Sequence, residues 1–408
     1  MLPTCARAWH NCVVAAAVES ATQSGDALGL YLEETKALVV DEIRRLVPAD
    51  DPNTGGLYEL MLDYPLRGGK GLRPALCIAT CRALGGSLAG VLPTAAVLEL
   101  YHNAFLVHDD VEDGSEKRRQ QDTLHRLHGV PIAVNVGDGM LALALRPLLD
   151  NMETLGMGRA LRLLLEVSQM SQQSAEGQML ELDWVRRVKW RLGDREYVRM
   201  VHKKSAWYSF VTPVAAGAIA AGAGERLAGR LRRFATLLGV AFQIQDDVLN
   251  LAGEEIRYGK EIGGDLWEGK HTLILIHALR NASPRERARA MRILGRDREG
   301  RGAEDRLRRR VLRVVDRLEA RGGADAASLR SLRRALGGSR KAARTRADVR
   351  FLQALIGRHG SIDYAWQQAR RRSLRAARAF KALCEEIPPS PHRAFLEDVI
   401  DYVVSRDR

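Results

Sequence analysis

Apolar residues recur at helical spacing along most of this 408-residue chain. The pattern predicts helices over residues 25–47, 91–113, 131–150 and 159–182, and another through the segment around residue 246. Several of these segments are apolar nearly all round, which is typical of helices inside a large bundle. No segment alternates between apolar and polar residues as a half-buried strand would. We therefore predict an all-α protein, a large helical bundle with a buried centre.

Acidic residues interrupt one of these apolar helices in the stretch from His102 to Arg119, HNAFLVHDDVEDGSEKRR. Asp109 and Asp113 are four residues apart, so their carboxylates project from one helix face, and Asp110 lies beside them. Converging carboxylates repel one another unless a cation joins them, and Mg²⁺ favours a few carboxylates plus phosphate oxygens. A solvated acidic helix end is the alternative for such a motif taken alone.

A second acidic pair repeats this design near residue 246, in FQIQDDVLN. Asp246 and Asp247 lie in another apolar helical segment, and Asn250 follows Asp246 by one turn. Two such helices that face each other would form a carboxylate-lined cleft, able to hold several Mg²⁺ ions and a diphosphate. The matching design favours a functional site for both segments.

Two glycine-rich segments carry cations that suit a bound diphosphate. RGGKGLRPAL places Arg67, Lys70 and Arg73 at a predicted helix start, where backbone N–H groups also favour anions. A basic turn on the surface is the alternative for this segment. YGKEIGGDLWEGKHT follows the second acidic pair and carries three more charged residues, Lys260, Asp265 and Lys270.

A lysine pair, Lys203 and Lys204, precedes Ser205 in another helical segment. These lysines could reach the same cavity, where they would balance the charge of a diphosphate. For one of the two we favour the alternative of a helix-surface position.

The net charge of +13 is concentrated in one segment. Residues 285–350 contain 21 Arg and one Lys against nine acidic residues, whereas the rest of the chain has 41 basic and 41 acidic residues. Within this segment, LRRRVLRVVDRLEARGG places apolar residues on one helix face with arginines around it: Leu307, Val311, Val314, Val315 and Leu318. The pattern suits a membrane-surface helix or a nucleic-acid patch. We favour a solvated insertion at about 301–343, and we expect no nucleic acid.

Composition and cysteine content fit a soluble globular protein of a reducing compartment. The chain is 46% hydrophobic and 28% charged, and its five cysteines form neither a disulfide framework nor a metal-spaced cluster. Cys77 and Cys81 share a helix face, and we expect buried thiols and a cytoplasmic location. No apolar run approaches the roughly 20 residues of a membrane span. We interpret residues 1–24 as a poorly ordered start rather than a signal peptide.

In combination, these segments resemble the trans-prenyl diphosphate synthase family, most closely its short-chain geranylgeranyl diphosphate synthases. The family pattern GGKxxRP is present as Gly68–Pro74, the first aspartate-rich motif with its Arg pair as Asp109–Arg119, and the second as Gln243–Asn250. The similarity runs from about Leu28 to Leu279 and resumes from about Asp348 to Arg408. The resemblance implies one isoprenoid-synthase helical domain with a central cavity over residues 25–408, interrupted by the Arg-rich insertion.

The resemblance also implies the roles of individual residues. Mg²⁺ and an allylic diphosphate are held by Asp109, Asp113 and Asp246, with Asp110 and Asp247 as further catalytic acids. The phosphates of the allylic substrate contact a second set: Arg118, Lys204, Ser205, Gln243, Lys260 and Lys270. Isopentenyl diphosphate binds a third set: Lys70, Arg73, His102 and Arg119. The implied reaction is a Mg²⁺-dependent head-to-tail condensation inside a dry apolar tunnel, carried out by a homodimer.

Four positions depart from the family pattern. Gln120 and Asp122 stand where the family usually has Gly and Pro, Ser205 stands where Thr is common, and Asn250 replaces a third Asp. Ser205 still offers a hydroxyl group, and we expect Gln120 and Asp122 to alter only the loop after the Arg pair.

Product length is predicted from the residues one helical turn before Asp109. In the family, bulky side chains four and five places before this Asp act as the floor of the tunnel, and here those places are Phe105 and Ala104. Because Ala104 is small, we expect a geranylgeranyl product, and we expect Ala104→Tyr to shift it to farnesyl diphosphate. A farnesyl or longer-chain synthase is the alternative.

Two other classes of protein use similar features. A terpene cyclase of the ionisation type also carries acidic helices and Mg²⁺, but it needs only one diphosphate site, whereas this chain has two cationic sets. A non-catalytic partner subunit should have lost acids from one motif, and this chain has not.

Overall fold

The computed structural model describes residues 27–48, 52–252, 264–296, 310–318, 325, 328–329, 331–333 and 344–405. Within those ranges the chain is almost entirely helical, which confirms the predicted all-α class. The elements are α2 (Ala27–Leu46), η1 (Pro52–Thr54), α3 (Leu57–Leu66), α4 (Leu72–Ala83), α5 (Leu88–Asp113), β1 (Lys117–Arg118), β2 (Gln121–Asp122), α6 (Leu124–His128), α7 (Val130–Leu143), α8 (Leu145–Leu155), α9 (Met157–Arg187), α10 (Asp194–Val201), η2 (His202–Val211), α11 (Thr212–Ala220), α12 (Glu225–Ala252), α14 (Gly264–Glu268), α15 (Leu273–Asn281), α16 (Pro284–Leu294), α19 (Arg346–Arg358), α20 (Ser361–Leu383) and α21 (Pro391–Ser405).

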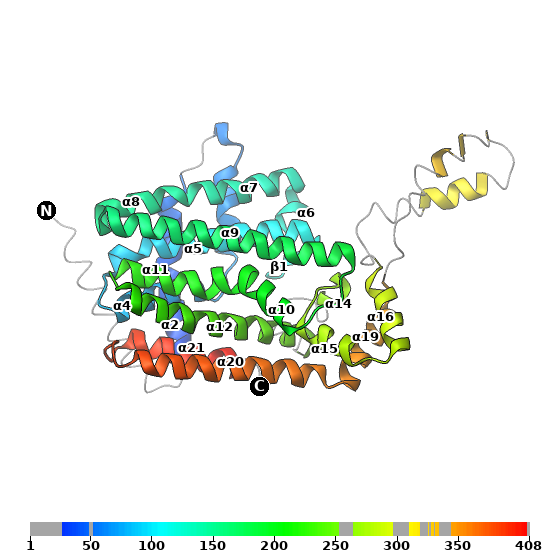
Figure 1. The fold of residues 1–408 in the computed structure, drawn as a ribbon. Coiled ribbons are helices and arrows are strands. Elements are labelled where there is room, and N and C mark those ends of the chain that lie inside the picture. Colours follow the sequence, from blue (N-terminus) through cyan, green and yellow to red (C-terminus); the bar gives the residue numbers. More distant parts are fainter. Residues whose placement is uncertain are drawn as a thin grey trace.

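The helices form a bundle in which α5, α9 and α12 lie between two outer layers. Figure 1 shows α7 and α8 along the top of the view and α20 and α21 along the bottom. α12 packs against α20 and η2, and α9 packs against α8 and η2. The two helices that carry the acidic motifs, α5 and α12, are thereby brought to the middle of the bundle.

α5 places the first acidic motif at its C-terminal end. Ser87 caps the start of the helix, where its side chain accepts a hydrogen bond from the Gly90 N–H, and Gly114 caps its end with a φ of 62° that glycine readily adopts. Most of the helix is buried, so its end is held firmly by packing. Carboxylates are unfavourable at a helix C-terminus, because the helix dipole is negative there. The acids of α5 therefore need cations for compensation.

The predicted helix over 131–150 is in fact two helices, α7 and α8, with a break at Ala144. Pro147 lies in the first turn of α8 and has no N–H to donate to the carbonyl four residues earlier. A continuous helix would therefore lack a hydrogen bond at this point, and the helix is interrupted at Ala144, which keeps a right-handed helical conformation.

Two segments are long and apolar enough to cross a membrane by length and composition, namely α5 and residues Val130–Leu155. Our expectation from the sequence that no run approached this length was therefore wrong. The α5 window is 72% buried inside the bundle, as expected for a core helix, whereas the window in Val130–Leu155 is 39% buried. Several aliphatic side chains of α7, α8 and α9 lie at the surface.

Candidate active site

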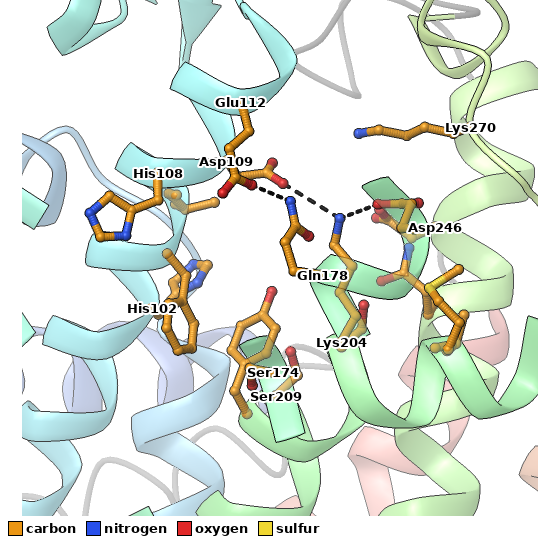
Figure 2. Close-up of a pocket in the computed structure, with 18 of the residues that line it drawn as sticks. His102, His108, Asp109, Glu112, Ser174, Gln178, Lys204, Ser209, Asp246 and Lys270 are labelled. Atoms are coloured by element: carbon orange, nitrogen blue, oxygen red, sulfur yellow. Dashed lines mark hydrogen bonds and ion pairs between the residues drawn. The ribbon is translucent and has the colours of Figure 1, made fainter. Parts of the chain in front are cut away.

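A cavity of about 660 Å³ lies between α5, α9, η2 and α12. Both acidic motifs contribute to its wall, Asp109 from α5 and Asp246 and Asp247 from α12. In Figure 2, Asp109 and Asp246 lie on opposite sides of the cavity, with Lys204 and Gln178 between them. The structure therefore brings together two motifs that are more than 130 residues apart in the sequence.

Lys204 joins the first motif to α9. Its Nζ lies 3.5 Å from an Asp109 oxygen and also forms an ion pair with Glu181. Burial opposes the charged form of Lys204, but Glu181 and Asp109 raise its pKa above the usual value. The pKa of Glu181 is lowered, because its attraction to Lys204 and Lys270 outweighs the effect of burial. Lys204 is therefore a cation fixed at the acidic wall.

Lys270 has the same relation to the other acid of this helix face. Its Nζ lies 2.8 Å from Asp113 and 3.0 Å from Glu268. Burial raises the pKa of Asp113 to about 6, although Lys270 acts in the opposite direction. The pKa of Lys270 is raised by Asp113 and Glu268 against the effect of burial. Asp109 and Asp113 thus each have their own lysine, although only Asp109 of the two is among the residues that line the cavity.

Asp110 does not face the cavity, contrary to its assignment as a catalytic acid. Its carboxylate is fully buried, forms a bidentate ion pair with Arg118, and accepts a hydrogen bond of 2.8 Å from the Tyr64 hydroxyl. On α5 the two neighbouring acids point in different directions, so Asp109 lines the cavity and Asp110 does not. Asp110 therefore holds Arg118, which itself lines the cavity and lies 3.8 Å from Asp109.

In the second motif the division between neighbouring acids is only partial, because both Asp246 and Asp247 line the cavity. Asp247 is buried, accepts a hydrogen bond of 2.7 Å from the Tyr197 hydroxyl, and accepts another of 3.0 Å from the Gln243 side-chain amide. Burial and the nearby Asp265 raise the pKa of the Asp247 carboxyl above its usual value. Asp246 and Asp265 both line the cavity. Asn250 accepts from the backbone N–H of Asp265, which ties α14 to α12.

The lysine pair lies on a π-helix, η2, where we had predicted an ordinary helix. Such i→i+5 segments are rare and occur mostly at functional sites. Lys204 and Ser205 line the cavity, whereas Lys203 pairs with Glu176 outside it, so one lysine of the pair is a helix-surface residue, as expected. A Cβ atom at Gly177 would overlap the backbone of Lys204. This glycine therefore lets α9 approach η2 closely enough to place Lys204.

The four residues assigned to isopentenyl diphosphate do not all reach the cavity. Arg73 and His102 line it, and Arg73 donates to Ser209 at 2.8 Å. Burial, followed by the charges of Arg73 and Arg119, lowers the pKa of His102, so this ring is neutral near pH 7. Arg119 donates to the Tyr64 carbonyl and lies against Gly69, where a Cβ atom would be 2.8 Å from its guanidinium. Arg119 is therefore held beside the cavity by the Gly68–Pro74 loop.

Lys70 lies outside the cavity wall. Its side chain is exposed, and its Nζ is 2.7 Å from the Tyr402 hydroxyl of α21. Arg67 is likewise used within the fold, through an ion pair with Asp63 on its own helix. Lys260 lies outside the described residues.

A short hairpin, β1 and β2, presents the Arg pair. Its register pairs Arg118 with Gln121, and the two turn residues, Arg119 and Gln120, have φ values of 52° and 66°. Both values lie in the left-handed region, as the tight turn of a hairpin requires. The position of Gln120 therefore favours glycine, which explains why the family pattern has Gly there and shows that the departure adds backbone strain.

Comparison with known proteins decides which family carries this arrangement. The family model for polyprenyl synthetases matches residues 56–310, which is more than half of the chain. The chain belongs to the polyprenyl synthetase family.

Individual members of this family are similar over most of their length. A short chain isoprenyl diphosphate synthase of Methanocaldococcus jannaschii is 33% identical over 255 residues, covering 62% of this chain and 75% of the relative. A geranylgeranyl pyrophosphate synthase of Geoglobus acetivorans is 28% identical over 92% of this chain and 98% of the relative. A geranylfarnesyl diphosphate synthase of Aeropyrum pernix is 34% identical over 254 residues, covering 61% and 76%.

The fold agrees with solved structures of the same family. The crystal structure of a geranylgeranyl pyrophosphate synthetase from Pyrococcus horikoshii has a TM-score of 0.73 at 28% sequence identity, covering 93% of this chain and 98% of that one. The polyprenyl synthetase described here is therefore a prenyltransferase and a prenyl diphosphate synthase.

The part of the cavity away from the acids is aromatic. Phe105 lines it and forms edge-to-face contacts with Tyr208 and Tyr101, at ring-centroid distances of 5.6 and 5.9 Å. Ala104, which we had expected beside Phe105 at the tunnel floor, is not among the lining residues. It is fully buried in an apolar cluster with Met61, and two side chains packed against that cluster, Leu106 and Leu141, line the cavity. The predicted position of Ala104 at the tunnel floor is therefore wrong, whereas the chain-length role of Phe105 stays a prediction.

Several lining residues of this polyprenyl synthetase escaped the sequence analysis. The most important come from α9, where Ser174, Gln178 and Glu181 face the cavity. Their spacing of four and three residues puts them on one helix face. This polar stripe on an otherwise buried helix was the signal that could have revealed them. Tyr64 and Tyr197, which hold the inward acids, had no local signal.

The donor set fits the Mg²⁺ ions that the motifs imply. Asp109 and Asp246 offer carboxylate oxygens from opposite sides of the cavity, whereas Asp113, one turn after Asp109, is not a lining residue but pairs with Lys270, which is. Among the described residues no group of three acidic, histidine or cysteine side chains is already close enough to hold a metal ion alone. Mg²⁺ usually binds through one or two carboxylates together with waters and substrate phosphates.

Proposed function

We propose that this prenyltransferase makes geranylgeranyl diphosphate, by Mg²⁺-dependent head-to-tail condensation of isopentenyl diphosphate with an allylic diphosphate. The observation that carries the proposal is the separation of two cationic groups around one cavity. Lys204 and Lys270 lie among the acids, whereas Arg73, beside neutral His102, forms a second group. A cyclase needs one diphosphate site, so two groups favour condensation of two diphosphates.

The acidic side suits the allylic diphosphate. Asp109, Asp113 and Asp246 would hold Mg²⁺, which when bound supplies neutralisation of the departing diphosphate. Lys204 and Lys270 are preorganised cations beside these acids, so they can stabilise the same negative charge without reorganisation. Ser205 and Gln243 add polar groups to this part of the wall.

The other side suits isopentenyl diphosphate. Arg73 offers a guanidinium that is already oriented by Ser209 and by the Tyr208 ring, which lies 4.6 Å away. His102 is neutral, so it can donate or accept a hydrogen bond without adding charge. Phe105, Tyr101 and Tyr208 keep the adjoining space apolar, and this excludes water from a carbocation.

Product length is the most specific part of the proposal. The names of the relatives include geranylgeranyl and geranylfarnesyl diphosphate synthases, so they leave more than one length open. Phe105 supports the shorter of these two products, because its ring stands in the apolar part of the cavity. One helical turn is about 5 Å, similar to one prenyl unit, so a single ring can stop elongation.

The experiment is a product analysis of purified protein with Mg²⁺, isopentenyl diphosphate and each allylic diphosphate from five to fifteen carbons. We expect twenty-carbon product for the wild type and longer product for Phe105→Ala. Ala104→Tyr serves as the matched control. Because Ala104 lies behind the lining residues and not among them, this variant should lose stability, and we expect little shortening of the product. An unchanged length in Phe105→Ala would place the floor elsewhere, and no incorporation by the wild type would refute the synthase proposal.

A homodimer belongs to the same proposal. Two neighbouring helices each expose a pair of leucines four residues apart, Leu145 and Leu149 on α8 and Leu161 and Leu165 on α9. Leu165 is 68% exposed. Contiguous exposed apolar surface marks interaction sites, and a second copy would cover it. Light scattering should give twice the chain mass, and Leu165→Glu should reduce it to one chain.

A further inference from the structure

Arg344 is a buried arginine outside the cavity, at the point where the structure describes the chain again after residue 333. Its side chain is 3% exposed. It lies two residues before α19, at the end of the Arg-rich segment that the family pattern does not explain. A guanidinium is costly to bury unless its donors are satisfied, so its partners indicate what it does.

Four backbone carbonyls accept hydrogen bonds from this guanidinium. Two are the last carbonyls of α16, Ile293 at 3.3 Å and Leu294 at 2.9 Å. The others belong to α14, Leu266 at 3.5 Å and Trp267. The final carbonyls of a helix have no partner within the helix, and the helix dipole is negative at that end. One cation therefore caps the C-terminal ends of two helices at once.

The capped end of α14 leads directly into the active site. Gly269 and Lys270 follow it and donate their backbone N–H groups back to the Asp265 carbonyl, at 2.8 and 2.9 Å. Lys270 then reaches Asp113. Gly269 has a φ of 74°, and a Cβ atom there would overlap the Arg344 guanidinium. The turn that aims Lys270 is therefore packed on Arg344.

We propose that Arg344 is a positioning residue for the diphosphate site, acting through α14 on the direction of Lys270. The proposal rests on the synthase function proposed above. The described hydrogen bonds of Arg344 go to α14 and α16, and α14 leads to Lys270 among the acids, so we expect its effect to be confined to the allylic diphosphate. A purely structural cap would instead lower stability and affect both substrates equally.

The experiment compares Arg344→Gln, Arg344→Lys and a matched control, Arg296→Gln, in the full-length chain. Arg296 pairs with Asp348 at 2.6 Å at the same junction of α16 and α19, but makes no described contact with α14. In Arg344→Gln we expect the KM for the allylic diphosphate to rise about tenfold, and the KM for isopentenyl diphosphate to stay within about twofold. Arg344→Lys keeps the positive charge but lacks the planar, forked guanidinium group. Its KM for the allylic diphosphate should therefore rise less than that of Arg344→Gln. Arg296→Gln should leave both KM values unchanged.

Amide hydrogen exchange of residues 264–272 provides a second measurement that does not depend on activity. We expect faster exchange there in Arg344→Gln than in Arg296→Gln. If Arg344→Gln does not fold, Gly269→Ala tests the same contact from the other side and should reproduce the split in KM. Equal changes in both KM values, or unchanged exchange in this segment, would overturn the proposal. A wild type without synthase activity would refute the proposed function instead. Amide hydrogen exchange would still test whether Arg344 holds α14 in place.

Discussion

The two acidic motifs follow one plan but differ in how the inward acid is neutralised. In each motif the first Asp lines the cavity and the second accepts a hydrogen bond from a buried tyrosine hydroxyl, although Asp247 also lines the cavity and Asp110 does not. Tyr64 donates to Asp110 on α5, and Tyr197 donates to Asp247 on α12. Asp110 also has the guanidinium of Arg118, whereas the described hydrogen bonds of Asp247 come from neutral groups.

The second acids of the two motifs therefore differ in role. Asp110 has a structural role, whereas Asp247 combines a structural contact with a place in the cavity wall. Asp110 is fully buried and anchors a cavity arginine, so the first motif uses its second acid to shape the wall. Asp247 still lines the cavity, with its pKa raised by burial and by Asp265. A pair of adjacent aspartates in a helix therefore does not imply two metal ligands, and the burial of each acid decides its role.

The largest expected effect concerns the outward acids. Asp109→Asn and Asp246→Asn should each lower turnover by about 10³-fold, since each removes charge from the site that stabilises the departing diphosphate. Both variants should fold, because the loss of one carboxylate relieves repulsion in an acidic wall. Turnover is measured by incorporation of labelled isopentenyl diphosphate, and Asp41→Asn, a surface acid of α2, is the control. Near-normal activity in either variant would contradict a site shared by both motifs.

The inward acids should differ in stability. Asp110→Ala removes the bidentate partner of buried Arg118 and leaves it Asp109 at 3.8 Å, and we expect a loss of about 3–5 kcal/mol in the free energy of unfolding. Asp247→Ala leaves a hydroxyl and an amide, its described donors, without their acceptor, so the loss should be about 1–3 kcal/mol. Denaturant unfolding of the two variants gives the comparison directly. Equal losses would mean that Arg118 does not distinguish the motifs.

Replacement of the two tyrosines should lower the free energy of unfolding in the opposite order, with the larger loss in the second motif. Tyr64→Phe removes a donor from an acid that retains Arg118, so we expect a loss of about 1 kcal/mol. In Tyr197→Phe the Asp247 carboxyl keeps the Gln243 amide among its described donors, and the loss should be larger, about 2 kcal/mol. Both are measured by the same unfolding experiment, and a larger loss in Tyr64→Phe would reverse our interpretation.

The smallest effect is expected from the Arg-rich insertion. Replacing residues 301–343 by a short Gly/Ser linker should leave turnover within about twofold, because every described cavity residue lies outside this range. The replacement must keep Arg344. Loss of soluble, active protein would show that the segment is structural, and salt-sensitive binding of the intact chain to anionic vesicles would favour the membrane alternative.

The sequence was sufficient for the helices and for the acids, because both depend on local spacing. Periodicity located α5 and α12, and a spacing of four residues put Asp109 and Asp113 on one face. The sequence was not sufficient to predict hydrogen bonds between residues that are far apart along the chain. Tyr64 and Asp110 are 46 residues apart, and Tyr197 and Asp247 are 50 apart, so no local pattern connects them.

The remaining errors of the sequence analysis concern residues whose surroundings are set by packing across the fold. The sequence shows Ala104 as small and one turn from the motif, but not that Met61 and other core residues surround it. Lys70 belongs to a recognisable motif, but Tyr402, more than 300 residues away, sets its direction. The contribution of α9 was missed because isolated polar residues on a long helix are ordinarily solvated, and only the assembled bundle shows that they face a cavity.

The π-helical segment η2 makes the length of the chain itself a determinant of activity. Its i→i+5 bonding accommodates one residue more in a turn than the i→i+4 bonding of the neighbouring helices. Loss of a single residue between 206 and 211 would restore α-helical bonding and rotate Lys204 by about 100° relative to α11. Such a deletion leaves Lys204 and both acidic motifs unchanged, yet it would turn the lysine away from Asp109. We therefore expect the number of residues in this segment to matter for activity as much as the identity of its lysine.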